Sequence, residues 1–205
     1  MKLYTFPQAP NPRRVHVYLA EKGLEIPWEE VDILRGASRT PEYRERIDPT
    51  GRVPVLELDD GSHLAESVAI CRYLEALHPE PPLFGVTPEA RGRVEMWIRR
   101  IDMDLMTPAG LVWIHGSPLT AKAVKERVPE IVEPSRRAIA HQYALLDREL
   151  AERPFLAGDA YSMADIVGLT TVDFAAQLCE SPPDPDLVHL ARWHRRVSER
   201  PSARI

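Results

Sequence analysis

The pattern of the chain changes abruptly part-way along, and this change constrains the fold more than any other feature. Residues 2–80 alternate between strand-like and helix-like segments, whereas no strand pattern follows the proline-rich segment HPEPPLFG at 78–85. Closely spaced prolines interrupt regular structure, so this segment is a natural boundary. The sequence predicts an α/β domain over residues 1–80, a linker over 81–86 and an all-helical domain over 87–205.

Within the first domain, the alternation of segments predicts the order β-α-β-α-β-β-α. The last two strands are separated by Asp59-Asp60-Gly61, which is a strong hairpin signal. A strand–helix–strand unit followed by a hairpin and a helix implies a mixed sheet with helices on its faces. The expected strands cover 2–6, 26–33, 53–58 and 62–66, and the expected helical segments cover 12–23, part of 37–49, and 67–79.

The turn between the first strand and the first helix has an unusual composition. Residues 7–12 include no Ser, Thr, Cys, Tyr or His. Asn11 is a favourable N-cap, Pro12 suits the first helical position, and Gly23 suits the end of the helix. If this turn belongs to an active site, its own side chains do not include an ordinary nucleophile.

Composition and charge restrict the class of protein. Of the 205 residues, 44% are apolar, which is enough for a normal buried core, and the net charge is −5. Charges of both signs are mixed along the chain without a basic block, so no nucleic-acid partner is expected. No signal peptide and no apolar run long enough to span a membrane are visible, so we expect no membrane partner and a cytoplasmic location.

The cysteines and histidines give no sign of redox or metal chemistry. Cys71 and Cys179 are far apart and lie in no CxxC motif, and the histidines lack ligand spacing. Free cysteines are commonly buried, so we expect both to be small core residues. No disulfide and no metal site are expected.

The segment GRVPVLELDDGSHLAES at 51–67 carries the features that indicate a ligand. Val53-Pro54 opens a strand, where a proline is tolerated, and a cis bond there would leave the Val53 backbone free to pair with a bound peptide. Across the hairpin, Glu66-Ser67 lies at a strand end and a helix start. A helix start favours a carboxylate ligand, Ser67 adds a hydroxyl, and Glu66 is able to hold an ammonium group.

This motif and its surroundings resemble the thioredoxin-like domain of glutathione transferases. The second half agrees, because RPFLAGDAYSMADI at 153–166 is similar to the signature of that family's helical domain. There Ser162 and Asp165 are expected to form a structural N-capping box. The resemblance covers essentially the whole chain and implies a thioredoxin-like βαβαββα domain followed by a helical bundle. The expected helices of the bundle lie at roughly 87–106, 131–152, 162–179 and 187–200.

The resemblance also implies roles for individual residues. Val53 is expected to pair its backbone with the cysteinyl part of glutathione, and Pro54 is expected to be cis. Glu66 and Ser67 are expected to hold the γ-glutamyl ammonium and carboxylate. The expected partners of the glycyl carboxylate are Arg39 and Arg52.

In this family glutathione supplies the nucleophilic sulfur, so the protein has to stabilise its thiolate. The position that holds a serine in one branch of the family is Ala9 here. Ala9-Pro10-Asn11 is similar to the Thr-Pro-Asn of bacterial Nu-like members, with the threonine replaced. Asn11 is then the best remaining donor to the sulfur, although a second interpretation makes it a helix cap only. Met106 and Trp113 are expected to line the pocket for the electrophile.

Three functions remain open at this stage. The chain resembles an enzyme that conjugates glutathione to a small electrophile, and it also resembles Nu-like members that reduce disulfides or peroxides with glutathione. Ala9 keeps open a third function, a non-catalytic protein that binds glutathione or another ligand. The family resemblance further implies a homodimer.

Overall fold

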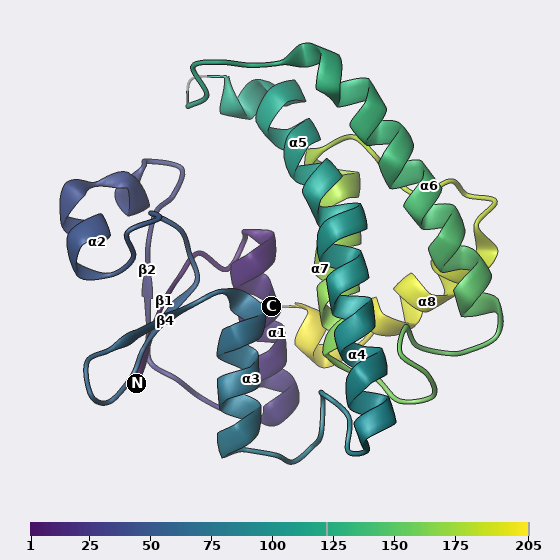
Figure 1. The fold of residues 1–205 in the computed structure, drawn as a ribbon, viewed down its shortest axis with the longest axis horizontal. Coiled ribbons are helices and arrows are strands. Elements are labelled where there is room, and N and C mark those ends of the chain that lie inside the picture. The colour runs from purple at the N-terminus through teal and green to yellow at the C-terminus, as the bar shows by residue number, and fades with distance from the viewer. Residues whose placement is uncertain (122, 205) are drawn as a thin grey trace. The chain divides into compact units, whose positions relative to one another are not determined.

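The computed structural model describes residues 1–121 and 123–204, which form two compact units (Figure 1). Unit 1 comprises Met1–Leu83 together with the C-terminal segment that begins at Pro201, and unit 2 comprises Phe84–Arg200. The division between Leu83 and Phe84 falls inside the segment expected to be a linker. The sequence placed the residues after Pro201 in the helical domain, whereas the structure groups them with unit 1.

Unit 1 has the predicted order of strands and helices. A mixed four-stranded sheet has the strand order β2-β1-β3-β4, with β1 and β2 parallel and the other two pairs antiparallel. The elements are β1 (Lys2–Thr5), α1 (Pro10–Lys22), β2 (Trp28–Glu30), η1 (Ala37–Arg39), α2 (Pro41–Arg46), β3 (Val55–Glu57), β4 (His63–Ala65), α3 (Ser67–Leu77) and η5 (Pro201–Arg204).

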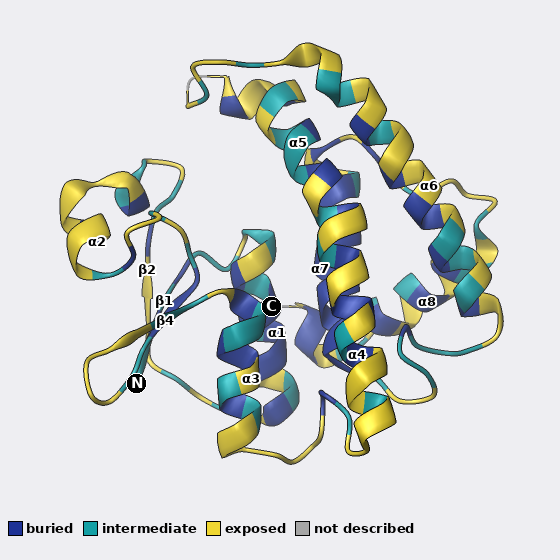
Figure 2. Ribbon diagram, in the orientation of Figure 1, coloured by how far each residue is buried: buried dark blue, intermediate teal, exposed yellow. Residues whose placement is uncertain are grey.

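The core of unit 1 lies between the sheet and two helices. Helices α1 and α3 cover one face of the sheet (Figure 1), and both helices carry buried residues along their length (Figure 2). Leu3 and Leu56 point from β1 and β3 into this layer and are buried. Alternate residues of a strand point to opposite faces, so Lys2, Tyr4 and Glu57 lie on the other face.

Unit 2 is all-helical over the residues that the structure describes, as predicted. Helix α7 lies at its centre and is buried along most of its length. The helical segments are α4 (Pro88–Ile101), η2 (Asp102–Met106), α5 (Thr107–Gly116), η3 (Pro118–Thr120), η4 (Pro129–Ile131), α6 (Val132–Ala151), α7 (Met163–Leu178) and α8 (Val188–Ser198).

The first helix of unit 2 extends further than the sequence predicted. Its expected end was at about residue 106, but helical structure continues to Gly116 through a π-helical segment, η2. Pro108 lacks an N–H group and cannot continue the α-helical ladder. The backbone N–H of Thr107 instead reaches the carbonyl of Asp102, five residues back, and the Thr107 hydroxyl donates to the same oxygen at 2.9 Å. The proline therefore produces a π segment rather than a helix end.

Asp165 joins three parts of unit 2 at the start of α7. Ser162 and Asp165 form the capping box, in which the Asp165 carboxylate accepts a hydrogen bond from the Ser162 N–H at 3.0 Å. Its other oxygen accepts from the Leu156 N–H and from Trp193 Nε1, both at 2.9 Å. Burial raises the pKa of Asp165 to about 6, an effect that the hydrogen bonds oppose.

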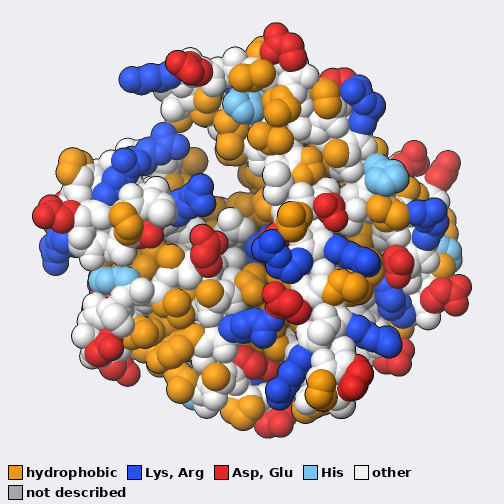
Figure 3. All heavy atoms as spheres, in the orientation of Figure 1, with side chains coloured by type: hydrophobic (Ala, Val, Ile, Leu, Met, Phe, Trp, Pro, Cys, Tyr) orange, Lys and Arg blue, Asp and Glu red, His pale blue; other side chains and the backbone are white. Residues whose placement is uncertain are grey.

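Two general expectations from the sequence concern charge and membranes. On the face drawn in Figure 3, Lys and Arg side chains alternate with Asp and Glu side chains on both units, which matches the mixed charges along the sequence. No helix in the described part of the chain is long and apolar enough to cross a membrane.

Candidate functional site

One edge of the sheet in unit 1 brings together the predicted ligand-binding segments. Strands β1, β2 and β4 run in one direction and β3 runs in the other. The ends of β1, β2 and β4 therefore lie at the same edge as the start of β3. The segments at this edge are the turn before α1, the connector after β2, Arg52-Val53-Pro54 before β3, and Glu66-Ser67 after β4.

Val53-Pro54 is placed so that its backbone stays outside the sheet ladder. The peptide bond between the two residues is cis, as predicted. The ladder begins at the next residue, since Val55 pairs with Ala65 on β4 and with Tyr4 on β1. A proline just before the first paired residue costs the sheet no hydrogen bond. Extending the same register by one residue places Pro54 beside Glu66.

The start of α3 is open to a ligand. Glu66 precedes the helix with φ 70° and ψ 116°, and no side chain caps the helix. The first intrahelical bond runs from the Ile70 N–H to the Glu66 carbonyl, so the preceding N–H groups have no intrahelical acceptor. Ser67 is 4% exposed, and its hydroxyl has no hydrogen-bond partner among the described residues. These groups together are able to donate hydrogen bonds to an anion.

The start of α1 corrects one prediction about Asn11. The helix begins at Pro10 with Ala9 as the N-cap, and its first bond runs from the Arg13 N–H to the Ala9 carbonyl at 3.0 Å. Asn11 therefore occupies the second helical position, and the interpretation of Asn11 as the cap is wrong. Two prolines suit the first turn of this helix, and the earlier one begins it.

The position of Asn11 leaves its side chain available. It is exposed, and within residues 1–121 and 123–204 it has no hydrogen-bond partner. Pro10 and Pro12 have no backbone N–H, so Asn11 carries the only N–H among the first three helical residues. Both its amide group and its backbone are thus able to donate at the start of α1.

Helices α1 and α3 differ from α2, α4, α7 and α8, whose first N–H groups have a side-chain acceptor. Helices α5 and α6, which continue from other helical segments, also lack a side-chain cap. Thr40 caps α2 by accepting from the Tyr43 N–H at 3.2 Å, and Thr87 caps α4 in the same way. Helix α7 has its capping box. The two helix starts at the predicted binding edge are left without a side-chain cap. The N–H groups at these two helix starts are therefore able to donate to an external group.

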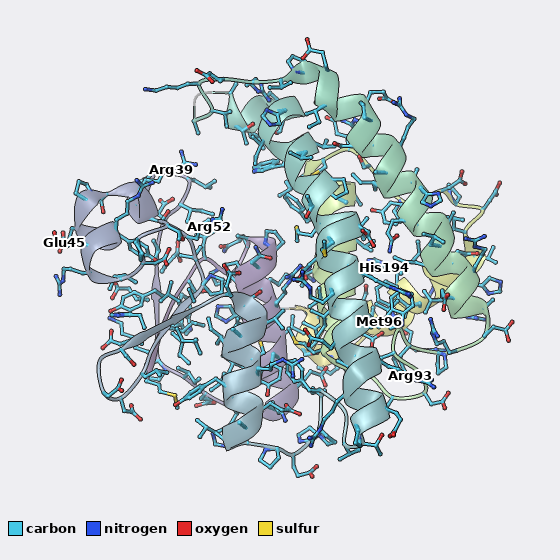
Figure 4. All side chains as sticks on the ribbon, in the orientation of Figure 1. Arg39, Glu45, Arg52, Arg93, Met96 and His194 are labelled. Carbon is cyan, nitrogen blue, oxygen red and sulfur yellow. The ribbon has the colours of Figure 1, made fainter. Side chains whose placement is uncertain are left out.

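Arg39 and Arg52 are both exposed and come from neighbouring stretches of backbone. A Cβ atom built on Gly51 would lie 2.8 Å from the Ser38 carbonyl oxygen, so the two chain segments nearly touch. Figure 4 shows both arginine side chains at the same end of unit 1, and Figure 3 shows basic side chains there. Two guanidinium groups in this position suit a carboxylate.

The close approach at Gly51 gives the first testable prediction. Gly51→Ala is expected to lower the free energy of unfolding by roughly 2–4 kcal/mol, because Gly51 has φ 69° and the new methyl group would meet backbone. Gly36→Ala is the matched control: its φ is 79°, but nothing lies within 4 Å of the added Cβ. Urea denaturation of both variants measures the difference. If both variants lost the same free energy of unfolding, the contact between the new methyl group and Ser38 would have no measurable cost.

The cysteines are placed as core residues. Cys71 is fully buried on α3 and Cys179 is 2% exposed at the end of α7. Burial raises the pKa of both thiols, that of Cys179 to about 12, so neither is a thiolate at neutral pH. Among residues 1–121 and 123–204, no group of three His, Cys, Asp or Glu side chains is arranged to hold a metal ion.

Met106 and Trp113 lie in unit 2, one at the end of η2 and the other in α5. Both are partly exposed. The Trp113 ring packs edge-on against Phe174 with the ring centres 5.9 Å apart. Unit 1 contains the other predicted site residues, namely Asn11, Arg39, Arg52, Val53, Pro54, Glu66 and Ser67.

Sequence reasoning missed two buried polar residues beside the Val53 backbone. Tyr43 and Asp48 both hydrogen-bond to the backbone of Arg52. The sequence Asp48-Pro49-Thr50-Gly51 is a turn signal, since Asp side chains commonly bond the backbone of a turn. The signal indicates a turn, but it does not show which peptide the side chains hold.

Comparisons with known proteins agree with this geometry. Residues 3–82 match the glutathione S-transferase N-terminal domain family, and residues 103–201 match the C-terminal domain family. Glutathione S-transferase 2 of Saccharomyces cerevisiae is 34% identical over 100% of this chain and 88% of its own length.

Solved structures show the same similarity over the whole chain. The crystal structure of Gtt2 from Saccharomyces cerevisiae is 33% identical with a TM-score of 0.93, covering 100% of this chain and 99% of that one. A glutathione S-transferase domain-containing protein from Marinobacter aquaeolei VT8 is 34% identical with a TM-score of 0.93, covering 99% of this chain and 100% of the other. The chain belongs to the glutathione S-transferase family of enzymes.

Proposed function

We propose that the protein binds glutathione at the sheet edge of unit 1 and directs its thiolate at an electrophilic carbon of a small molecule. The observation that carries this proposal is the open start of α3 beside Val53-Pro54. There the hydroxyl of the largely buried Ser67 and backbone N–H groups have no partner of their own among the described residues. A carboxylate of glutathione would supply the missing acceptor.

Each part of glutathione has a suitable group at this edge. The γ-glutamyl carboxylate binds Ser67 and the start of α3, and Glu66 holds the ammonium group. The cysteinyl backbone pairs with the backbone of Val53, which precedes the first ladder residue. Arg39 and Arg52 bind the glycyl carboxylate, a task for which guanidinium groups are well suited.

Asn11 stabilises the thiolate in this proposal. A free thiol has a pKa of about 8.5, and lowering it by two units requires about 2.7 kcal/mol of preferential stabilisation of the anion. The Asn11 amide donates to the sulfur, and the start of α1 adds positive potential. The side chain is exposed and has no partner in the described structure, so no bond has to break first.

Unit 2 contributes the electrophile pocket. Met106 and Trp113 are its proposed apolar contacts, because they are large, partly exposed side chains on consecutive helical segments. The π segment that ends at Met106 locally changes which side chains face outward, and such segments are frequent at functional sites. We also propose a homodimer, as the family resemblance implies, which sedimentation measurements would test.

Reduction of a disulfide is the second candidate reaction. Two glutathiones would reduce one disulfide, giving two thiols and glutathione disulfide. The buried, protonated state of Cys71 and Cys179 favours a route in which both attacking thiols come from glutathione. Turnover of a chlorodinitrobenzene-type substrate supports conjugation, whereas rapid disulfide reduction with weak conjugation supports this alternative. Glutathione binding without turnover of either substrate would identify a binding protein.

The role of Asn11 is testable because the structure removes its capping role. Asn11→Ala is expected to lower kcat roughly tenfold, with little change in glutathione affinity or thermal stability, because the lost interaction matters mainly for the thiolate. The pKa of the bound thiol, measured by thiolate absorbance against pH, should rise. Gln8→Ala removes a similar exposed amide from the same turn and should have no effect.

Asn11→Asp makes the test of Asn11 sharper. The side chain is almost the same size, but it has no donor and adds a negative charge. It should therefore raise the thiol pKa more than Asn11→Ala does. A thiol pKa unchanged in both variants would assign thiolate stabilisation to other groups while leaving glutathione binding intact.

A further inference from the structure

Each of the two peptide units that precede Val53 is held by a buried side chain. The Tyr43 hydroxyl donates to the Arg52 carbonyl oxygen at 2.8 Å, and the Arg52 N–H donates to Asp48 Oδ2 at 3.0 Å. Tyr43 is 8% exposed and Asp48 is 5% exposed. The main chain of an otherwise exposed residue is thus fixed on both sides by groups from the interior.

The bond from Tyr43 fixes more than the Arg52 carbonyl. The Arg52 C=O and the Val53 N–H belong to one planar trans peptide unit, so the direction of one sets the direction of the other. The Val53 N–H is the donor proposed to meet the cysteinyl carbonyl of glutathione. By binding the Arg52 carbonyl, the Tyr43 hydroxyl therefore fixes the direction of the Val53 N–H, which is the proposed binding group. Burial raises the pKa of this hydroxyl, so it remains a donor at all physiological pH values.

Asp48 and Tyr43 are themselves joined by a hydrogen bond, so they hold the backbone of Arg52 together. The Asp48 N–H donates to the Tyr43 carbonyl at 3.1 Å, which fixes the two residues relative to each other at the end of α2. The Thr50 hydroxyl donates to the same Asp48 oxygen that receives the Arg52 N–H. Gly51, with its positive φ, lets the chain turn around this carboxylate.

We propose that Tyr43 and Asp48 are positioning residues for glutathione. Tyr43 holds the Arg52–Val53 peptide in the orientation that the cysteinyl backbone of glutathione requires, and Asp48 holds the Gly51–Arg52 peptide before it. This inference rests on the proposed function of unit 1. It assigns to α2 and the following turn the task of presenting the Val53 N–H to the central, cysteinyl part of the ligand, whereas the start of α3 binds the γ-glutamyl end. Preorganising a donor in this way gains affinity because little order has to be imposed on binding.

The test is Tyr43→Phe, which removes one donor and keeps the ring. The dissociation constants of glutathione and S-methylglutathione are both expected to rise about three- to tenfold, as for the loss of one neutral hydrogen bond. The pKa of the bound thiol and kcat at saturating glutathione should stay as in the wild type. This pattern separates Tyr43 from Asn11, whose replacement should move the thiol pKa and leave binding unchanged.

Tyr143→Phe is the matched control. Tyr143 is 1% exposed in unit 2, and its hydroxyl also donates to a backbone carbonyl, that of Ser181, at 3.0 Å. Both variants should lose similar thermal stability, but only Tyr43→Phe should weaken binding. Unchanged glutathione affinity in Tyr43→Phe would overturn the inference, and so would an equal loss in Tyr143→Phe.

Variants of Asp48 keep the inference testable if Tyr43→Phe does not fold. Asp48→Asn keeps an oxygen for the Arg52 N–H but loses the charge, so the loss of affinity should be smaller than in Asp48→Ala. Equal affinity of wild type and Asp48→Ala for both ligands would overturn the role of Asp48. Failure of the wild-type protein to bind glutathione at all is a different result, because it would reject the proposed function itself.

Discussion

Asp165→Ala is expected to lower the free energy of unfolding at neutral pH by roughly 4 kcal/mol, because four buried donors would lose their acceptor at once. These donors are the Leu156 N–H, the Ser162 N–H and hydroxyl, and Trp193 Nε1. Asp165 has 0% exposure, so water cannot replace the carboxylate without opening the start of α7. Urea denaturation measures the loss. A change below about 1 kcal/mol would show that the donors find other partners.

The pH dependence of stability provides a second measurement at the same residue. Burial raises the pKa of folded Asp165 from 3.8 to about 6, so between these values the folded state binds more protons than the unfolded state. The contribution of this group to stability is therefore complete below pH 3.8 and declines as the pH rises through about 6. Asp165→Asn does not titrate. The stability of the wild type relative to Asp165→Asn should fall by up to about 3 kcal/mol from pH 4 to pH 7. A constant difference would mean that the carboxyl is ionised throughout.

The capping box and the ligand motif could be predicted because each depends on local spacing. Ser162 and Asp165 are three residues apart before an apolar run, and together with the resemblance of 153–166 to the family's signature this spacing predicts the start of α7. The hairpin signal at Asp59-Asp60-Gly61 similarly sets β3 against β4, so Val53-Pro54 and Glu66-Ser67 come to the same edge. In both cases the chain needs no distant contact to adopt the predicted geometry.

Other features could not be predicted because local patterns allow two outcomes. Pro10 and Pro12 both suit the first turn of a helix, and only the structure shows that the earlier one begins α1. Pro108 commonly ends a helix, yet here the Thr107 N–H bonds to Asp102 and the helix continues. In each case the proline restricts the backbone, but the sequence does not show whether a helix begins or ends there or continues with an irregular turn.

Contacts between residues that are distant in sequence cannot be predicted from local patterns. Arg13 Nη2 donates to the Ala203 carbonyl at 3.0 Å, across 190 positions of sequence, and joins the C-terminal segment to α1. Tyr43 and Asp48 are near Arg52 in sequence, but their side chains reach it only because the turn around Gly51 has a particular conformation. Local patterns in the sequence therefore suggest candidate ligand contacts, but they do not show which residues hold those contacts in place.

Ser67→Ala is expected to weaken glutathione binding roughly tenfold or more, since a hydrogen bond to a charged group contributes about 1.5–3 kcal/mol. Unlike Asp165→Ala, this substitution should leave the stability of the protein without ligand unchanged. Ser67 is largely buried and its hydroxyl has no partner among the described residues, so removing the hydroxyl takes no hydrogen bond from the folded protein without ligand. Thermal unfolding without glutathione should therefore be unchanged, while the stabilisation gained on adding glutathione should decrease.

Ser135→Ala is the matched control for Ser67→Ala. Ser135 is 5% exposed on α6 in unit 2, and its hydroxyl also has no partner in the described part of the chain. Its removal should leave both stability and glutathione affinity unchanged. Calorimetric titration with glutathione compares the two variants directly. If Ser67→Ala lost stability without ligand and bound glutathione normally, Ser67 would be part of the fold. The ligand carboxylate would then need another site, because the open start of α3 carries the proposal only if its groups are unsatisfied until glutathione binds.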